Sequence, residues 1–344
     1  MINRIFTAHK GHRGRSLSGV SLAVISAALL VFASGQIPAL AAESASSTAC
    51  PSLVEPGDDL TAAELPEGTS AIDCDLIGEV VREGEVAVTI PQPGRGVSAT
   101  SIGEDGAPEE ELTVEVSESG EISYTEHPED ELPSEPDEGQ SPYTTVLGAC
   151  DDTANSELSH TEWGTYNWYV GDGGMPGALS KSDAATAFAD AINNITGSYN
   201  NCGLEDQVNA SASYQGTTTY EADINSSGTC TEEDGKSTWD AGDLPSTRVA
   251  ITCTHYWAVT YDLYEADVRY NTTDFDFVNE VTSSCVNKYD VRSVGTHEAG
   301  HVFGLGHVSG TSHSNQTMYT NSFLCNEKAR TLGYGDVLGL RSIY

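Results

Sequence analysis

Basic residues are scarce in this chain of 344 residues. Lysine and arginine together number 15, against 52 aspartate and glutamate residues, and the formal net charge at pH 7 is −37. Nucleic acid is therefore disfavoured as a partner, because its phosphates would be repelled. Self-repulsion of this size favours a soluble product. The acidity is compatible with a salty habitat or with calcium binding, but no motif specifies a structural calcium ion.

Long hydrophobic runs are almost absent as well. The longest, Val20 to Ala33, has about fourteen residues, which is short for a membrane-spanning helix. A basic segment precedes this run, and Ala39-Leu40-Ala41 follows it as a small-x-small cleavage site. We predict that residues 1–41 are a signal peptide, with bacterial export and no membrane span after its removal. An uncleaved membrane anchor is the alternative.

Closely spaced cysteine pairs are missing. None of the eight cysteines belongs to a C-x-x-C pair, which excludes a zinc ribbon and a thioredoxin-like redox motif. An even number of cysteines in an exported chain favours disulfides. We predict a Cys50–Cys74 bridge rather than a thiol that binds a metal. The other cysteines allow fifteen pairings, which the sequence leaves open: Cys150, Cys202, Cys230, Cys253, Cys285 and Cys325.

Residues 297–307 contain the most informative pattern in the chain, H-E-x-x-H-x-x-G-x-x-H. His297 and His301 are four residues apart, so a helix places them one turn apart on the same face. Gly304 can take a positive φ, end that helix and reverse the chain. His307 can then supply a third imidazole. A solvent-exposed amphipathic helix is the alternative, but it gives no reason for three histidines at these spacings.

Three imidazoles with a fourth position open are the ligand set of a catalytic zinc ion rather than a structural one. Zinc lowers the pKa of its bound water to roughly 7. Glu298, next to the first ligand, would act as general base and later protonate the leaving amine. The sequence therefore predicts one zinc ion held by His297, His301 and His307, with Glu298 as the catalytic residue.

This pattern resembles the zinc-binding consensus of the metzincin metallopeptidases. The segment Gln316 to Thr320 is similar to the Met-turn of those enzymes, and Met318 would form an apolar floor beneath the ligands. The segment Asp336 to Tyr344 resembles the C-terminal helix of the matrixin branch. Val308, after the third histidine, matches no branch. The resemblance is close over residues 248–344, loose over 160–247, and does not include residues 1–140.

The resemblance implies an α+β fold for residues 143–344: a twisted mixed sheet, an active-site helix, a Met-turn and a C-terminal helix. We expect strands near 165–170, 248–257 and 261–270, and helices from Ser180 or Ser182 to Gly197 and from Asp290 to Phe303. We expect the edge strand that aligns substrate within Thr272 to Glu280. The segment from Met318 to Leu332 would form a wall of the pocket for the residue after the scissile bond.

Residues 42–142 differ sharply in composition from the rest. Residues 42–140 contain 26 acidic and 2 basic residues. Alternating segments at Glu85 to Ile90 and Leu112 to Val116 predict short strands. We interpret this region as an acidic, β-rich and partly disordered pro-region that blocks the cleft, with a linker from Glu126 to Gln140. A solvating or surface-attachment segment is the alternative.

The function predicted from the sequence is that of a secreted zinc metalloendopeptidase made as a zymogen. It would hydrolyse peptide bonds of extracellular proteins through a zinc-bound water that Glu298 activates. We expect protein or peptide substrates and a monomeric enzyme. The alternative is a non-catalytic cell-surface or binding protein on a metzincin scaffold.

Overall fold

The computed structural model describes residues 50–51, 59–66, 68–126, 145–231 and 233–344. The predicted signal peptide lies outside these residues. So does the predicted acidic linker, apart from Glu126.

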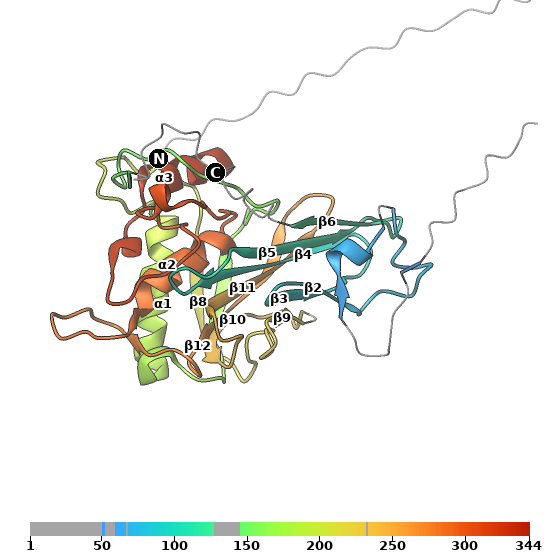
Figure 1. Ribbon diagram of the computed structural model, residues 1–344, viewed down its shortest axis with the longest axis horizontal. Coiled ribbons are helices and arrows are strands. Elements are labelled where there is room, and N and C mark those ends of the chain that lie inside the picture. Colours follow the sequence, from blue (N-terminus) through green and yellow to red (C-terminus); the bar gives the residue numbers. More distant parts are fainter. Residues whose placement is uncertain (1–49, 52–58, 67, 127–144, 232) are drawn as a thin grey trace, which may run out of the picture. The chain divides into compact units, whose positions relative to one another are not determined.

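The main sheet has eight strands in the order β6-β5-β4-β11-β12-β10-β7-β8 (Figure 1). The strands β12, β10, β7 and β8 run parallel to one another, whereas β11, β4, β5 and β6 are joined by antiparallel pairing. Their bounds are β4 (Arg95–Gly103), β5 (Glu110–Val116), β6 (Ile122–Glu126), β7 (Tyr166–Val170), β8 (Ala212–Thr217), β10 (Ser237–Gly242), β11 (Arg248–Trp257) and β12 (Leu263–Asn271).

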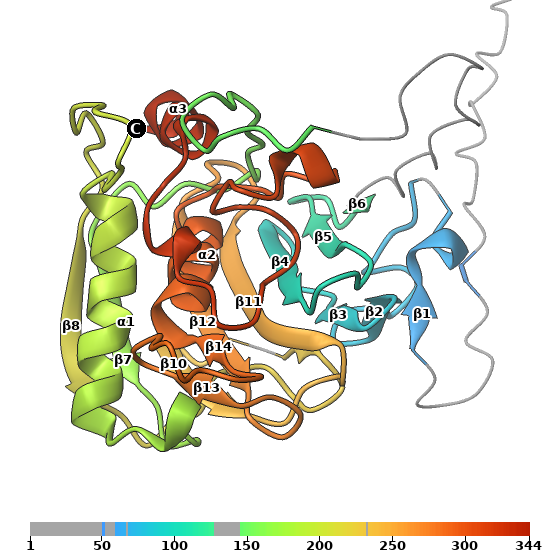
Figure 2. The same cartoon turned by 60° about the vertical axis from the view of Figure 1, so that its left-hand side comes forward.

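Three α-helices belong to the C-terminal part: α1 (Lys181–Thr196), α2 (Val291–Val302) and α3 (Tyr334–Ile343). Ser180 caps α1 by accepting from the N–H of Asp183, and the apolar stripe of α1 is buried. Figure 2 shows α1 beside α2, and Asn194 donates to Thr296 across the two helices at 3.0 Å. These helices share one hydrophobic core with one face of the sheet.

A second core lies on the opposite face of the sheet. It joins apolar side chains of the N-terminal region, such as Val88 and Leu112, to Ile251 and Cys253 of β11. A small sheet in the order β1-β2-β3-β9 covers this core. The bounds of the short elements are β1 (Leu60–Thr61), β2 (Val80–Glu83), β3 (Val86–Thr89), β9 (Thr229–Cys230), β13 (Phe277–Val278), β14 (Tyr289–Asp290), and the 3₁₀ turns η1 (Ala62–Glu64), η2 (Pro176–Ala178), η3 (Thr311–His313) and η4 (Lys328–Arg330).

The mixed sheet and the helices predicted from the sequence are confirmed, but one prediction is wrong. Within Thr272 to Glu280, the expected edge strand, the chain forms only the two-residue strand β13, which pairs with β14 outside the main sheet. Among the strands of the C-terminal part, the one at the edge of the sheet next to α2 is β11. The N-terminal strand β4 pairs with β11 along its length. The alternation of Val97 and Ala99 with the polar residues Ser98 and Thr100 was the signal for β4 that the sequence analysis missed.

The structure pairs Cys150 with Cys202, Cys230 with Cys253, and Cys285 with Cys325. It also contains the predicted Cys50–Cys74 bridge. No free cysteine remains among the described residues. None of the helices in the described part of the chain is both long and apolar enough to cross a membrane.

Candidate metal centre and catalytic site

Helix α2 supplies the first two histidines and Glu298. Asp290 caps the helix by accepting from the N–H of Ser293 at 2.8 Å, as the sequence predicted. Arg330 holds the same carboxylate with two hydrogen bonds of 2.8 and 2.5 Å. Because α2 is buried along almost its whole length, packing fixes the orientation of the face that carries His297, Glu298 and His301.

The chain reverses at Gly304, which has φ of 88°. Its N–H donates to the carbonyl of His301, and the N–H of Leu305 donates to the carbonyl of Gly300. A Cβ at Gly304 would lie 2.6 Å from the carbonyl oxygen of His160. Both the backbone conformation and this close approach therefore require glycine, and the reversal returns His307 toward the helix.

Replacing Gly304 by alanine should destabilise the fold and disturb the metal site. Backbone strain should cost about 1–2 kcal/mol, and the overlap with His160 should add roughly 1–3 kcal/mol. Gly106 is a matched control, because its φ is 87° and a Cβ there meets nothing within 4 Å. Denaturant unfolding and zinc content would measure the effect. Equal losses from Gly304→Ala and Gly106→Ala would show that the close approach is unimportant.

The three histidines converge as predicted. Their Nε2 atoms are separated by 3.0 Å (His297 and His301), 3.1 Å (His297 and His307) and 3.1 Å (His301 and His307). A tetrahedral zinc with bonds of about 2.0–2.1 Å would separate its ligand nitrogens by roughly 3.3 Å. The three imidazoles therefore form a group that could hold one metal ion.

The outer nitrogens of the rings have partners of their own. The Nδ1 of His297 donates to the carbonyl of Thr317 at 2.8 Å, and that of His301 donates to the carbonyl of Leu305 at 2.9 Å. Because a carbonyl can only accept, Nδ1 carries the proton and Nε2 keeps a lone pair for a metal. The Nδ1 of His307 lies 3.3 Å from an oxygen of Glu109, which belongs to the N-terminal region.

Burial keeps the ligand rings neutral. It lowers the pKa of His297 to about 3, with a further contribution from His307. It lowers the pKa of His301 well below its ordinary value, again helped by the neighbouring rings. Neutral imidazoles with free Nε2 lone pairs are the state that zinc requires.

Glu298 is fully buried beside the three histidines. The hydroxyl of Thr252 on β11 donates to its Oε2 at 2.5 Å, and the backbone N–H of Ile102 on β4 also donates to this carboxylate. Burial raises the pKa of Glu298 to about 8, against the opposing effect of these hydrogen bonds. Neither Thr252 nor Ile102 was found from the sequence, since both reach the site only through the pairing of the sheet.

Met318 lies beneath α2. A Cβ on Gly300 would overlap the Met318 sulfur, so the thioether packs directly against the backbone between two ligands. The buried carboxylate of Asp336 accepts from the N–H groups of Thr317, Met318 and Gly333. Asp336 thus connects α3 to the segment below the histidines, a role that could not be predicted from local sequence. The assignment of this segment as a Met-turn stays a prediction.

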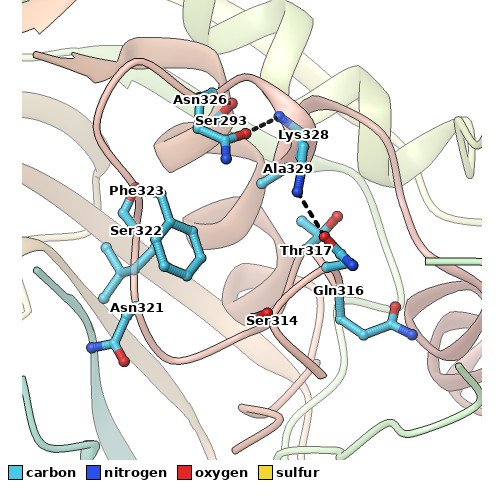
Figure 3. Close-up of a pocket in the computed structure, with 12 residues that line it drawn as sticks. Ser293, Ser314, Gln316, Thr317, Asn321, Ser322, Phe323, Asn326, Lys328 and Ala329 are labelled. Carbon is cyan, nitrogen blue, oxygen red and sulfur yellow. Dashed lines mark hydrogen bonds between the residues drawn. The ribbon is translucent and has the colours of Figure 1, made fainter. Parts of the chain in front are cut away.

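A small cavity of about 30 Å³ lies beside the site (Figure 3). Its lining is mostly polar, with Ser293 from α2, Thr317 next to Met318, and Phe323 as the labelled aromatic side chain. The carbonyl of Thr317 is also the partner of His297, so the cavity directly adjoins the metal ligands. Ile102 of β4 contributes to the same lining.

The N-terminal region closes the site. His297, Glu298 and His301 are 0 % exposed and His307 is 2 % exposed. Ile102 contacts Glu298 from β4, while Glu109 and Glu111 reach the His307 ring from the start of β5. A peptide has no access to Glu298 in this arrangement.

A comparison with protein families agrees with this geometry. The family model for matrixins matches residues 207–344, which include α2, the three histidines and α3. None of the curated proteins compared with the chain matches it. Matrixins are zinc metallopeptidases, and the matched segment contains the complete histidine triad. Residues 207–344 are therefore similar to the catalytic domain of matrixin-like metzincins.

Proposed function

We propose that the chain is the precursor of a secreted zinc metalloendopeptidase. The observation that supports this best is the convergence of three Nε2 atoms within 3.1 Å of one another, with the carboxylate of Glu298 on the same helix. His297, His301 and His307 would hold the zinc ion. When bound, zinc supplies a Lewis acid that lowers the pKa of water and polarises a carbonyl group.

Glu298 would perform the proton transfers. Its Oε2 is held by Thr252, which leaves Oε1 to accept a proton from the attacking water. The same carboxyl group would then protonate the departing amine nitrogen, so that no other acid is needed. The carbonyl partners of His297 and His301 keep the ligand rings oriented during this cycle.

The substrate would be an extended peptide that pairs with β11. This strand borders α2, and Thr252 in its middle contacts Glu298. Main-chain hydrogen bonds to a sheet edge give affinity that does not depend on sequence. The cavity lined by Ser293, Thr317 and Phe323 would receive the side chain that follows the scissile bond. Its small volume favours a small side chain.

The N-terminal region would keep the precursor latent by occupying that same edge. β4 pairs antiparallel with β11 from Arg95 opposite Trp257 to Gly103 opposite Arg248. In this register Ile102 lies over Glu298 and lines the cavity proposed for the substrate side chain. β4 would therefore be a strand that imitates substrate, and no cysteine is involved because Cys50 and Cys74 bind each other.

Buried charges would hold the N-terminal region (residues 59–126), here called the inhibitory segment, against the C-terminal part. Arg248, at the start of β11, is fully buried and donates to Glu85 at 3.0 Å and to the carbonyl of Pro108 at 2.8 Å. The hydroxyl of Tyr256 donates to Glu115 at 2.8 Å. Each disulfide joins cysteines on the same side of the linker. After a cut in the linker, only noncovalent contacts would remain.

Removal of the metal tests the proposed reaction. The chain, cut in the linker and freed of residues 42–126, should hydrolyse denatured casein. Treatment with a chelator should abolish this activity, and one equivalent of zinc should restore it, because the three neutral imidazoles would hold the ion. Product analysis by mass spectrometry would measure the cleavage. A zinc-loaded chain that binds casein without cleaving it would support a non-catalytic binding protein instead.

A further inference from the structure

The N-terminal region carries very little positive charge. Residues 42–140 include 26 acidic residues and only two basic ones, and one of the two is Arg95, the first residue of β4. Its guanidinium group lies against the C-terminal part of the chain. The Cζ atom is 5.3 Å from the centroid of the Trp257 ring and 5.6 Å from the centroid of the Tyr264 ring. Both distances are within the range of cation–π attraction.

A carboxylate completes the surroundings of this guanidinium group. Arg95 forms an ion pair with Glu233, and the two side chains are 29 % and 24 % exposed. The rings of Trp257 and Tyr264 are neighbours, with centroids 5.2 Å apart and planes inclined by 48°. Trp257 ends β11, Tyr264 lies on β12, and Glu233 precedes β10. These three residues, here called the cation site, all follow the linker, whereas Arg95 precedes it.

The cation site would lose this guanidinium group when the inhibitory segment leaves. Arg95 belongs to β4 and would leave with it, while the two rings and the carboxylate stay on the C-terminal part. Trp257 is already 46 % exposed in the precursor, so the departure of β4 would uncover more of its surface. Two accessible aromatic rings beside a carboxylate favour the binding of another guanidinium or ammonium group.

The register of β4 indicates where such a group would come from. The pairing of β4 with β11 keeps one register from Arg95, opposite Trp257, to Ile102. The N–H of Ile102 donates to Glu298, the residue proposed to protonate the leaving amine. A peptide in this register would place its scissile amide nitrogen at the position of the Ile102 nitrogen. The residue seven positions earlier would then lie opposite Trp257, about 24 Å away at roughly 3.4 Å per residue.

The odd spacing directs the two side chains to opposite faces of the sheet. Ile102 belongs to the core that the helices share with the sheet. Val97, which is on the same face of β4 as Arg95, belongs to the second core on the other side. The cation site is therefore separate from the cavity proposed for the side chain that follows the scissile bond. One extended substrate could occupy both.

We infer that Trp257, Tyr264 and Glu233 form a subsite for a basic side chain of the substrate, seven positions before the residue that follows the scissile bond. This inference rests on the proposed function, because a substrate that pairs with β11 is needed to bring the side chain there. Arg95 would imitate this side chain in the precursor, as β4 imitates the substrate backbone. Arginine suits the subsite better than lysine, because a planar guanidinium group can stack on a ring while it donates to a carboxylate.

Binding of a peptide that copies β4 tests the subsite without requiring hydrolysis. The full chain with Glu298→Gln is cut in its linker, both parts are kept together, and a fluorescent peptide copying residues 93–104 competes with the inhibitory segment. A second peptide has citrulline, a neutral isostere, in place of the arginine. We expect the arginine peptide to bind about tenfold more tightly. Equal affinities, or no binding of either peptide at millimolar concentration, would overturn the inference.

Variants assign the preference to the cation site. Tyr264→Leu and Glu233→Gln should each reduce the preference for arginine to about threefold or less and leave the affinity for the citrulline peptide unchanged. Tyr214→Leu is the control, because Tyr214 is another exposed aromatic residue but lies on β8, at the other edge of the sheet. It should keep the full preference. Because Glu233 is partly exposed, Glu233→Gln decides if the tyrosine variant does not fold. An unchanged preference in Glu233→Gln would contradict the inference.

Hydrolysis separates this inference from the proposed function. With Glu298 intact, a fluorogenic peptide with arginine seven positions before the residue that follows its scissile bond should have a kcat/KM about tenfold above that of its citrulline counterpart. The difference should appear in KM, because the subsite is remote from the reacting bond. Cleavage of both peptides at the same rate would count against the subsite. An arginine preference in binding, without cleavage of any peptide, would count against the peptidase.

Discussion

Replacing Glu298 by glutamine will leave zinc bound but reduce peptide hydrolysis by about 10³-fold or more. Glu298 is not one of the converging ligands, so the three imidazoles keep their geometry. The amide oxygen of glutamine can still accept the hydrogen bond from the Thr252 hydroxyl. The amide cannot, however, accept a proton from water and pass it to the leaving amine. The loss should therefore appear in kcat, with little change in KM.

The measurement needs zinc content, folding and kinetics from the same preparation. Glu205→Gln is a suitable control, since Glu205 is exposed and lies in a different part of the chain. It should retain wild-type activity. If Glu298→Gln hydrolyses peptides as fast as this control, Glu298 is not the base. If it loses zinc as well as activity, the carboxylate has a structural role in the metal centre.

The full precursor will show less than about 1 % of the activity of the separated C-terminal part. The three histidines and Glu298 are almost entirely buried, so substrate can bind only after β4 has separated from β11. An active fraction of about 1 % corresponds to roughly 2.7 kcal/mol in favour of the closed form. Cleavage within the linker should not be sufficient by itself, because the segment stays bound by noncovalent contacts.

A variant in the inhibitory segment can separate docking from cleavage. A side chain at Gly96 of β4 would overlap the ring of Tyr256 on β11. Gly96→Leu should therefore weaken docking and raise the activity of the cut precursor about tenfold or more. Ser119→Leu adds the same side chain at an exposed turn and should leave latency unchanged. Hydrolysis of a short fluorogenic peptide, measured before and after dilution, would report both effects.

Two results would count against latency by strand pairing. A precursor as active as the separated C-terminal part would show that β4 does not obstruct substrate, while the peptidase proposal would survive. A C-terminal part that unfolds on separation would show that residues 59–126 are a permanent part of the fold. This outcome is possible because the second core contains both Leu112 of the N-terminal region and Ile251 of β11, so that removing residues 59–126 would expose apolar side chains of β11.

The sequence could predict features that depend on neighbouring residues. The spacing of His297, His301 and His307 was sufficient to predict a shared ion, because a helix and one glycine turn fix those positions locally. The cap at Asp290 was predicted for the same reason, and the cap of α1 was narrowed to Ser180 or Ser182, of which the structure has Ser180; each capping side chain binds an N–H only three residues away. The pairing of the six other cysteines was beyond the sequence, because it depends on distances between remote segments.

Only the tertiary structure decided which strand lies beside Glu298 and the three histidines. The sequence placed the edge strand within Thr272 to Glu280, but that segment forms only β13, which pairs with β14, whereas β11 pairs with β4 and carries the Thr252 that contacts Glu298. Strand order, the contact of Ile102 with Glu298 and the position of Arg95 over two aromatic rings all arise from pairing between residues far apart in the chain. Local periodicity contains no information about such partners, because many registers would bury the same apolar side chains equally well.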